Sequence, residues 1–176
     1  MNIDNLVKIL PPPEIPREVP SLRDIVSFES KIAKLPSDYI SYLKHYGTGS
    51  ADNFICIYNP VSKNIYLNLF ERIQVQLEAL REIREFEGDK FPYAIFPEKD
   101  GLLPFGATDN GDFLCWKTNA DQAHWKVVVA EARAQNYEEY DMGIAEFLHK
   151  ILKKEIRVNI FPEDFPSEQP RFFPLP

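Results

Sequence analysis

The chain has few of the residues on which metal centres and disulfide frameworks depend. Among its 176 residues are 2 cysteines and 3 histidines. His45, His124 and His149 occur in no H-x-x-H, H-E-x-x-H or Cys/His pattern, so we expect structural or solvent-exposed roles for them. Cys56 and Cys115 lie in apolar runs typical of strands, which favours buried free thiols over a disulfide or redox pair. The sequence therefore predicts no metal site and no cofactor.

Long apolar runs and catalytic motifs are also missing. No apolar run reaches the 18 or so residues of a membrane-spanning helix, and residues 1–8 lack the basic region and apolar core of a signal peptide. We therefore predict a cytoplasmic protein without membrane contact. No G-x-S-x-G, P-loop or Rossmann glycine pattern occurs. We predict no catalytic residues and no enzymatic activity; an acid–base pair assembled from distant positions stays open as the third alternative.

Basic residues are fewer than acidic residues in this chain. The chain carries 20 lysines and arginines against 27 aspartates and glutamates, a formal charge of −7. A net acidic surface disfavours direct binding to nucleic acid or to an anionic membrane and suits a basic protein partner. The length fits one domain with a sizeable core.

Proline, by contrast, is concentrated near the two ends. Four prolines in residues 11–16 exclude a helix interior, so a short helix in residues 1–10 leads into an extended connector that ends at Pro20. Near the other end, prolines recur every four residues from Pro162 to Pro174, and three of them follow phenylalanine. We expect an extended arm over residues 156–176. It lies on its own domain, binds a partner or is disordered.

Capping residues mark the expected helices between these ends. Ser21-x-x-Asp24 is a capping box, and Leu22, Ile25, Val26 and Ile32 recur after it at helical spacing. A second helix begins near Pro36 and ends at Gly47, and a long third helix follows the capping residues Asn68 and Glu71. Asp141 is expected to cap a last helix that carries an apolar stripe from Ile144 to Leu152.

Strands are expected at residues 53–58, 63–67, 93–96, 102–108, 112–118 and 125–131. Asn110-Gly111 lies between two apolar runs and predicts a tight hairpin with a type I′ turn, which needs positive φ at both residues. Helices followed by strands, with one inserted and one closing helix, indicate an α+β fold with helices packed on a mainly antiparallel sheet. The expected core comprises Leu35, Tyr39, Leu43, Phe105, Trp116, Val128, Phe147 and Ile151.

Three stretches together resemble the SUKH superfamily. Residues 35–43, LPSDYISYL, are similar to its L-P-x-D-Y-x-x-[FY]-L helix. Residues 105–113 resemble its F-G-x-x-x-x-G-D-[FY] hairpin, and a strand bearing Trp125 precedes a closing helix with Phe147-Leu148 and Ile151-Leu152. The resemblance covers about residues 21–152, whereas the usual tryptophan of the first helix and the Asn-Gly after the second are replaced.

The superfamily includes fungal cell-wall-synthesis regulators of the Smi–Knr type and many bacterial immunity proteins. The resemblance implies a non-enzymatic protein-binding module, in first place an immunity protein that neutralises a cognate toxin by stoichiometric binding. A regulatory or scaffold module that binds a cellular protein is the alternative. Together with the proline-rich ends, the resemblance divides the chain into three expected parts: an N-terminal helix and connector over residues 1–20, a SUKH-like domain over 21–155 and an extended Phe/Pro-rich tail over 156–176.

Acidic residues are the candidates for partner binding. We expect one group near one end of the sheet and a second group in another exposed loop. If the partner is a basic nuclease toxin, these carboxylates take the place of substrate phosphates and steer association. Turn stabilisation is the alternative role for Asp109, and a metal site is disfavoured because Asp109-x-x-Asp112 is not a calcium-loop pattern. The candidates are Glu98, Asp100, Asp109 and Asp112 in the first group, and Glu138, Glu139 and Asp141 in the second.

Overall fold

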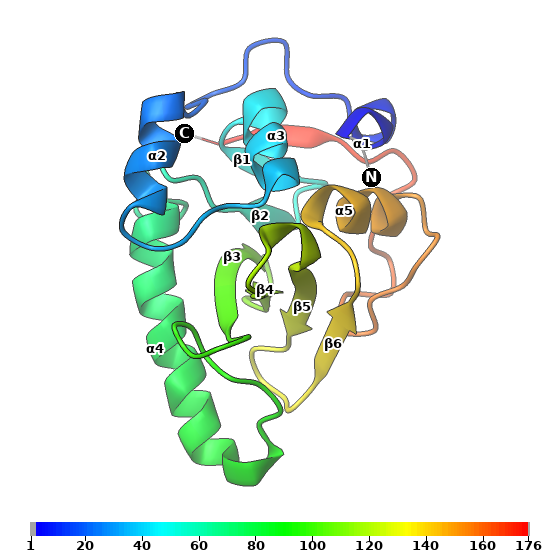
Figure 1. The fold of residues 1–176 in the computed structure, drawn as a ribbon. Coiled ribbons are helices and arrows are strands. Elements are labelled where there is room, and N and C mark those ends of the chain that lie inside the picture. Colours follow the sequence, from blue (N-terminus) through cyan, green and yellow to red (C-terminus); the bar gives the residue numbers. More distant parts are fainter. Residues whose placement is uncertain (1–2, 176) are drawn as a thin grey trace.

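The computed structural model describes residues 3–175 as five α-helices around one sheet (Figure 1). The helices are α1 (Ile3–Ile9), α2 (Leu22–Glu29), α3 (Ser37–Tyr46), α4 (Leu69–Glu87) and α5 (Ile144–Leu152). The strands are β1 (Gly49–Ala51), β2 (Ile55–Ile57), β3 (Leu102–Thr108), β4 (Phe113–Lys117), β5 (Lys126–Ala130), β6 (Tyr137–Tyr140) and β7 (Phe172–Pro174). Short 3₁₀ helices lie at Gly88–Lys90 and Gln122–His124.

The sheet has the strand order β6-β5-β4-β3-β2-β1-β7, and every pairing is antiparallel. The long helix α4 packs against β3, while α5 packs against α1 and α3 (Figure 1). The expected α+β class with an antiparallel sheet is confirmed. Within residues 3–175, no helix has the length and apolar character needed to cross a membrane.

All eight residues of the expected core are buried, and they belong to one apolar cluster. Trp116 of β4 is central to it, because its ring lies edge-on to Tyr39 of α3 at 5.1 Å and against Phe105 of β3 at 4.8 Å. The buried hydroxyl of Tyr39 has a hydrogen-bond partner, since it donates to the Tyr58 carbonyl at 2.6 Å. Tyr39 and Phe105, from the first two stretches that resemble the superfamily, thus both pack on Trp116 in the core.

The hairpin at Asn110-Gly111 is tight, but its turn type differs from the prediction. Gly111 N–H donates to the Thr108 carbonyl at 2.9 Å, and Thr108 N–H donates to the Asp112 carbonyl at 3.1 Å. Of the loop residues only Gly111 has positive φ, at 90°. This pattern is a type I turn followed by a glycine bulge, so the predicted type I′ turn is wrong.

Two predicted strands are also wrong. Residues 63–67 form turns because the Asn64 side-chain oxygen accepts from Tyr66 N–H and the Asn64 carbonyl accepts from Leu67 N–H, both at 2.9 Å. Residues 93–96 contribute one isolated bridge, between Ile95 and Leu102. The sheet is completed instead by β1, β6 and β7, which no sequence pattern predicted.

The two end segments pack onto this same domain. Leu6 and Leu10 are fully buried, and Tyr46 donates to the Leu10 carbonyl at 2.7 Å. After α5 the arm crosses Phe54, whose ring lies 4.6 Å from that of Phe165, and then adds β7 to the edge of β1. Pro174 is tolerated there because an edge strand does not need a donor on both sides.

Candidate binding surfaces

The first acidic group is divided between the two ends of β3. Glu98 and Asp100 precede this strand, whereas Asp109 and Asp112 follow it. A seven-residue strand spans about 20 Å at roughly 3.3 Å per residue. The expectation that these four carboxylates gather at one end of the sheet is therefore wrong.

Asp112 acts within the hairpin turn. It is 4% exposed, and its carboxylate accepts from the Thr108 hydroxyl at 2.7 Å and from Ala132 N–H at 3.3 Å. Asp109 N–H donates to the Phe54 carbonyl at 2.9 Å, while the residue itself stays exposed. Asp112 is thus a structural residue, and Asp109 is the member of this pair open to a partner.

At the other end of β3, Glu98 is paired across the surface with α4. Its carboxylate accepts from Arg84 at 2.7 and 3.0 Å, and this hydrogen bond lowers the pKa of Glu98 below its ordinary value. Asp100 is half-buried and has a φ of 56°. Glu98 is therefore already paired with a basic side chain of its own domain.

The second acidic group lies on and just after β6, not in a loop. Glu139 lies between Lys117 at 2.9 Å and Lys126 at 3.3 Å. Burial favours a raised pKa, but the hydrogen bonds from the two lysines outweigh it, and the pKa of Glu139 is lowered. Glu138 accepts from Ile160 N–H at 3.1 Å, and Asp141 lies 3.7 Å from Lys126.

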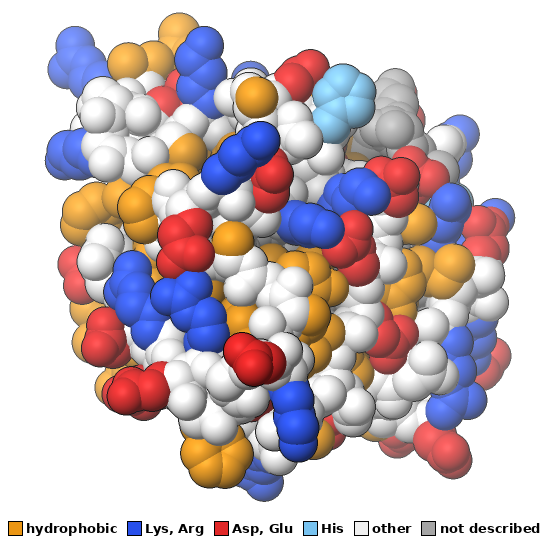
Figure 2. All heavy atoms as spheres, turned by 60° about the horizontal axis from the view of Figure 1, so that its bottom comes forward, with side chains coloured by type: hydrophobic (Ala, Val, Ile, Leu, Met, Phe, Trp, Pro, Cys, Tyr) orange, Lys and Arg blue, Asp and Glu red, His pale blue; other side chains and the backbone are white. Residues whose placement is uncertain are grey.

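The acidic candidates therefore form no common patch. On the face drawn in Figure 2, acidic and basic side chains are interspersed, without a broad area of one sign. Glu98, Asp112, Glu138 and Glu139 are all engaged by neighbouring groups. The candidates with most carboxylate surface left are Asp109 and Asp141.

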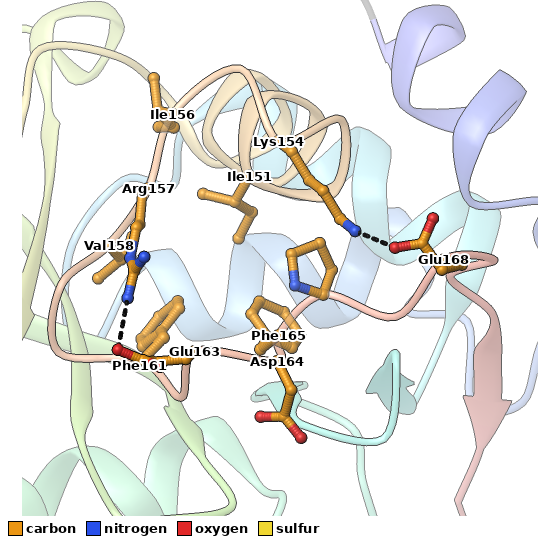
Figure 3. Close-up of a pocket in the computed structure, with 11 residues that line it drawn as sticks. Ile151, Lys154, Ile156, Arg157, Val158, Phe161, Glu163, Asp164, Phe165 and Glu168 are labelled. Carbon is orange, nitrogen blue, oxygen red and sulfur yellow. Dashed lines mark hydrogen bonds and ion pairs between the residues drawn. The ribbon is translucent and has the colours of Figure 1, made fainter.

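A cavity of about 460 Å³ lies where the arm leaves α5 (Figure 3). Its apolar lining comes from Ile151 of α5 and from arm residues that include Val158, Phe161 and Phe165. Two ion pairs cross its rim, Lys154–Glu168 at 2.6 Å and Arg157–Glu163 at 3.7 Å. Exposed ion pairs of this kind contribute little to stability.

Large apolar side chains are exposed along two neighbouring segments. Glu18 accepts from Lys63 N–H at 2.8 Å, and the Lys31 ammonium lies 5.9 Å from the ring centre of Phe70, so the segments around α2 and before α4 run side by side (Figure 1). We call their exposed side chains the α2 surface: Val19, Leu22, Val26, Ile65, Tyr66 and Phe70.

No sequence pattern predicted this surface. Helical spacing places Leu22 and Val26 on the apolar stripe of their helix, yet they are 80% and 55% exposed, while Ile25 and Phe28 turn inward. Tyr66 is 69% exposed because the predicted strand there is a turn that directs its side chain outward. Several large apolar side chains exposed on neighbouring segments are typical of interaction sites on folded domains.

The histidines hold separate local positions. His45 Nδ1 lies 2.8 Å from the Ser41 carbonyl, His124 lies 3.2 Å from Asp121, and His149 is buried in α5. Among residues 3–175, no three or more His, Cys, Asp or Glu side chains gather as metal ligands would.

Comparison with protein families gives a match over most of the chain. The SUKH_6 family model, described as SMI1-KNR4 cell-wall, matches residues 23–148. This range runs from α2 into α5 and includes residues 35–43 and 105–113, Trp125 and Phe147-Leu148 of the three stretches that resemble the superfamily. No curated protein matches the chain, and no solved structure matches it. Because the match covers more than half of the sequence, the chain belongs to the SMI1-KNR4 family of the SUKH superfamily.

Proposed function

We propose that this protein is a cytoplasmic, non-enzymatic binding module, and that it acts as an immunity protein that neutralises a cognate toxin by forming a stoichiometric complex. Membership of the SUKH superfamily supports a protein-binding role. The observation that carries the proposal is the α2 surface, where Leu22, Ile65 and Tyr66 are each more than 60% exposed. Side chains of this size commonly anchor protein interfaces.

The proposed mechanism is coverage of the toxin's active site or substrate groove. The α2 surface supplies apolar contact, and the net charge of −7 attracts a basic partner at long range. Asp100, Asp109 and Asp141 would steer the encounter through the electric field of the whole protein, to which each carboxylate contributes. Their carboxylates lie apart, but steering by this field does not require a common patch. The other acidic candidates would contribute to that field, though their carboxylates are held by neighbours.

A regulatory module that binds a cellular protein is the second proposal. The observation that supports it is the description of the matching family, which refers to the cell wall and thereby suggests a partner in wall synthesis. A toxic protein encoded immediately upstream would favour immunity.

Capture of the partner followed by a growth assay tests the first proposal. Co-expression of the captured protein should halt growth, and the parent chain should restore it. The double variant Leu22→Ala/Tyr66→Ala should bind about tenfold or more weakly and rescue poorly, as loss of interface anchors predicts. Phe86→Ala is the matched control, because Phe86 is 86% exposed at the far end of α4.

A partner without toxicity contradicts the immunity role. Unchanged partner affinity of the double variant contradicts the claim that the α2 surface binds the partner. Electrostatic steering is tested separately with the triple variant Asp100→Lys/Asp109→Lys/Asp141→Lys. This variant should associate with the partner more slowly at low salt, and its association rate should depend less on salt concentration. An unchanged on-rate at low salt would show that these carboxylates are merely solvated.

A further inference from the structure

Strand β6 is the last strand at one edge of the sheet: one side pairs with β5, and no strand of residues 3–175 pairs with the other. Just before β6 begins, Glu131 N–H donates to the Asn136 carbonyl at 3.0 Å. Hydrogen-bonded and non-hydrogen-bonded pairs alternate along antiparallel strands, so the backbone groups of Tyr137 and Glu139 face away from β5. Within residues 3–175, neither of these two N–H groups has an acceptor.

The backbone of this edge is open. Glu139 is an exposed residue although only 28% of its side chain is exposed, so its main chain contributes much of the exposed area. A groove of about 430 Å³ lies between β6 and the arm, which pass close to each other in Figure 1. The groove, called the β6 groove below, is lined by Glu131, Asn136, Tyr137, Glu138, Asn159 and Ile160. Its volume lies within the range of ligand pockets, so the edge has room for further extended chain.

The opposite edge of the sheet, at β7, is less suited to pairing. Asp52 N–H donates to the Arg171 carbonyl at 2.7 Å. By the same alternation, the backbone groups of Phe172 and Pro174 face away from β1. Proline has no N–H, so this edge offers one outward donor where β6 offers two. Because unpaired N–H and C=O groups on an edge are a template for pairing with another chain, β6 is the more favourable edge.

The β6 groove also contains two carboxylates without a cationic partner. Glu138 accepts from Ile160 N–H at 3.1 Å and from the Asn159 amide at 3.4 Å, and Glu131 accepts from the Asn136 amide at 2.6 Å. These donors are neutral, and within residues 3–175 neither glutamate forms an ion pair. The groove therefore complements a lysine or arginine side chain.

We infer that the free edge of β6 binds an extended segment of a protein partner, which adds a strand to the sheet and places a lysine or arginine in the β6 groove. The N–H groups of Tyr137 and Glu139 donate to carbonyls of that segment, and their own carbonyls accept from its N–H groups. In this mode of recognition main-chain hydrogen bonds give affinity and side-chain pockets give specificity. The inference rests on the proposed function only in naming a protein as the source of the segment.

A second copy of this chain fits the edge less well. In the antiparallel register that pairs Tyr137 of one copy with Glu139 of the other, the two Glu138 side chains would lie directly opposite each other. Like charges directly opposite on neighbouring strands are destabilising. An acidic segment would meet the same repulsion from Glu131 and Glu138.

Synthetic peptides test the edge without the partner. The probes are acetyl-Thr-Lys-Val-Lys-Val-Thr-amide, its acidic counterpart with glutamate in place of lysine, and the basic peptide N-methylated at two adjacent central residues. N-methylation removes the donors that pairing requires and retains the charge. With the basic peptide we expect saturable shifts of the Tyr137 and Glu139 amide signals in ¹⁵N spectra. Its apparent Kd should be at least tenfold lower than that of either other peptide.

Glu139→Pro removes one outward N–H, and an edge position tolerates proline. Glu139→Ala is the matched control, since it loses the same carboxylate but keeps the N–H. The basic peptide should bind Glu139→Pro at least tenfold more weakly than Glu139→Ala. The N-methylated peptide tests the same hydrogen bonds on the parent chain, so the result does not depend on the folding of Glu139→Pro.

The charge preference is tested with Glu131→Gln/Glu138→Gln, which should bind the basic peptide at least fivefold more weakly. Glu82→Gln/Glu85→Gln carries the same change of net charge at exposed positions of α4 and should bind it like the parent. Equal affinity for the three peptides, no saturable response, or undiminished affinity in Glu139→Pro or in Glu131→Gln/Glu138→Gln would each overturn the inference. So would a dimer of the parent chain in sedimentation that Glu139→Pro dissociates, because a second copy would then occupy the edge.

These results are independent of the growth assay. Leu22→Ala/Tyr66→Ala leaves the edge intact and should bind the basic peptide like the parent. Peptides that fail to bind while the parent chain rescues growth would refute only the edge site. Normal peptide binding by a chain whose captured partner is not toxic would refute only the immunity role.

Discussion

The Asp38 carboxylate accepts a hydrogen bond from Ala145 N–H at 3.1 Å, across 107 residues of sequence. Asp38 lies in the first turn of α3, and Ala145 lies in the first turn of α5. The N-cap residue of α5 is Gly143, which has no side chain to cap the helix, and the expected cap Asp141 lies two residues earlier. One carboxylate thus supplies the missing cap and fixes α5 against α3.

Asp38→Ala should lower the free energy of unfolding by about 1 kcal/mol, the usual loss when a capping acceptor is removed. Urea titration followed by circular dichroism measures it. Asp38→Asn keeps an acceptor at the same position and should lose less. Equal losses in the two variants would show that the hydrogen bond to Ala145 is not what stabilises the helix.

Gly143→Ala should destabilise the fold by roughly 1–3 kcal/mol, because a Cβ at this position would lie 2.4 Å from Asp38 Oδ2 and force the carboxylate away. In the double variant Asp38→Ala/Gly143→Ala that clash is gone. The combined loss should therefore be smaller than the sum of the single losses. Additive losses in a thermal or urea double-mutant cycle would argue against direct contact.

Gly111→Val should cost about 1–3 kcal/mol of stability, since a β-branched residue is strained at the φ of 90° that the bulge requires. Asn110→Val is the matched control: Asn110 is exposed and its φ is not positive, so the cost there should be smaller. Comparable denaturation midpoints for the two variants would contradict the glycine-bulge geometry.

Glu139→Gln should reduce stability by about 0.5–1 kcal/mol at pH 7, a small effect because solvent screens these pairs. The folded pKa of Glu139 is lowered, so its contribution is complete above the unfolded value of about 4.3 and is lost as pH falls through the folded pKa. The difference between parent and variant should therefore disappear in acid.

Unfolding measured from pH 7 down to pH 3 checks this dependence. Glu85→Gln, at an exposed position on α4, serves as the control and should show little difference at any pH. A gap between parent and Glu139→Gln that persists undiminished at pH 3 would point to packing instead of charge.

Local patterns predicted local structure well. The capping box at Ser21 and Asp24 is present with both of its hydrogen bonds, and Gly47 and Gly88 end their helices with positive φ. The buried stripe of α5 follows its apolar spacing because 3.6-residue periodicity places those side chains on one face. The strands of the hairpin followed from alternating apolar runs around a turn signal.

The sequence by itself therefore determined the fold class, the core and the family, because caps, turns and periodicity depend on residues a few positions apart. Only the tertiary structure decided which side chains are exposed at the surface. Whether Leu22 faces the core or solvent, and whether Asp112 is open to a partner, depends on which distant segments cover them. The cap of α5 is likewise set by a contact between residues far apart in the chain, which no local pattern records.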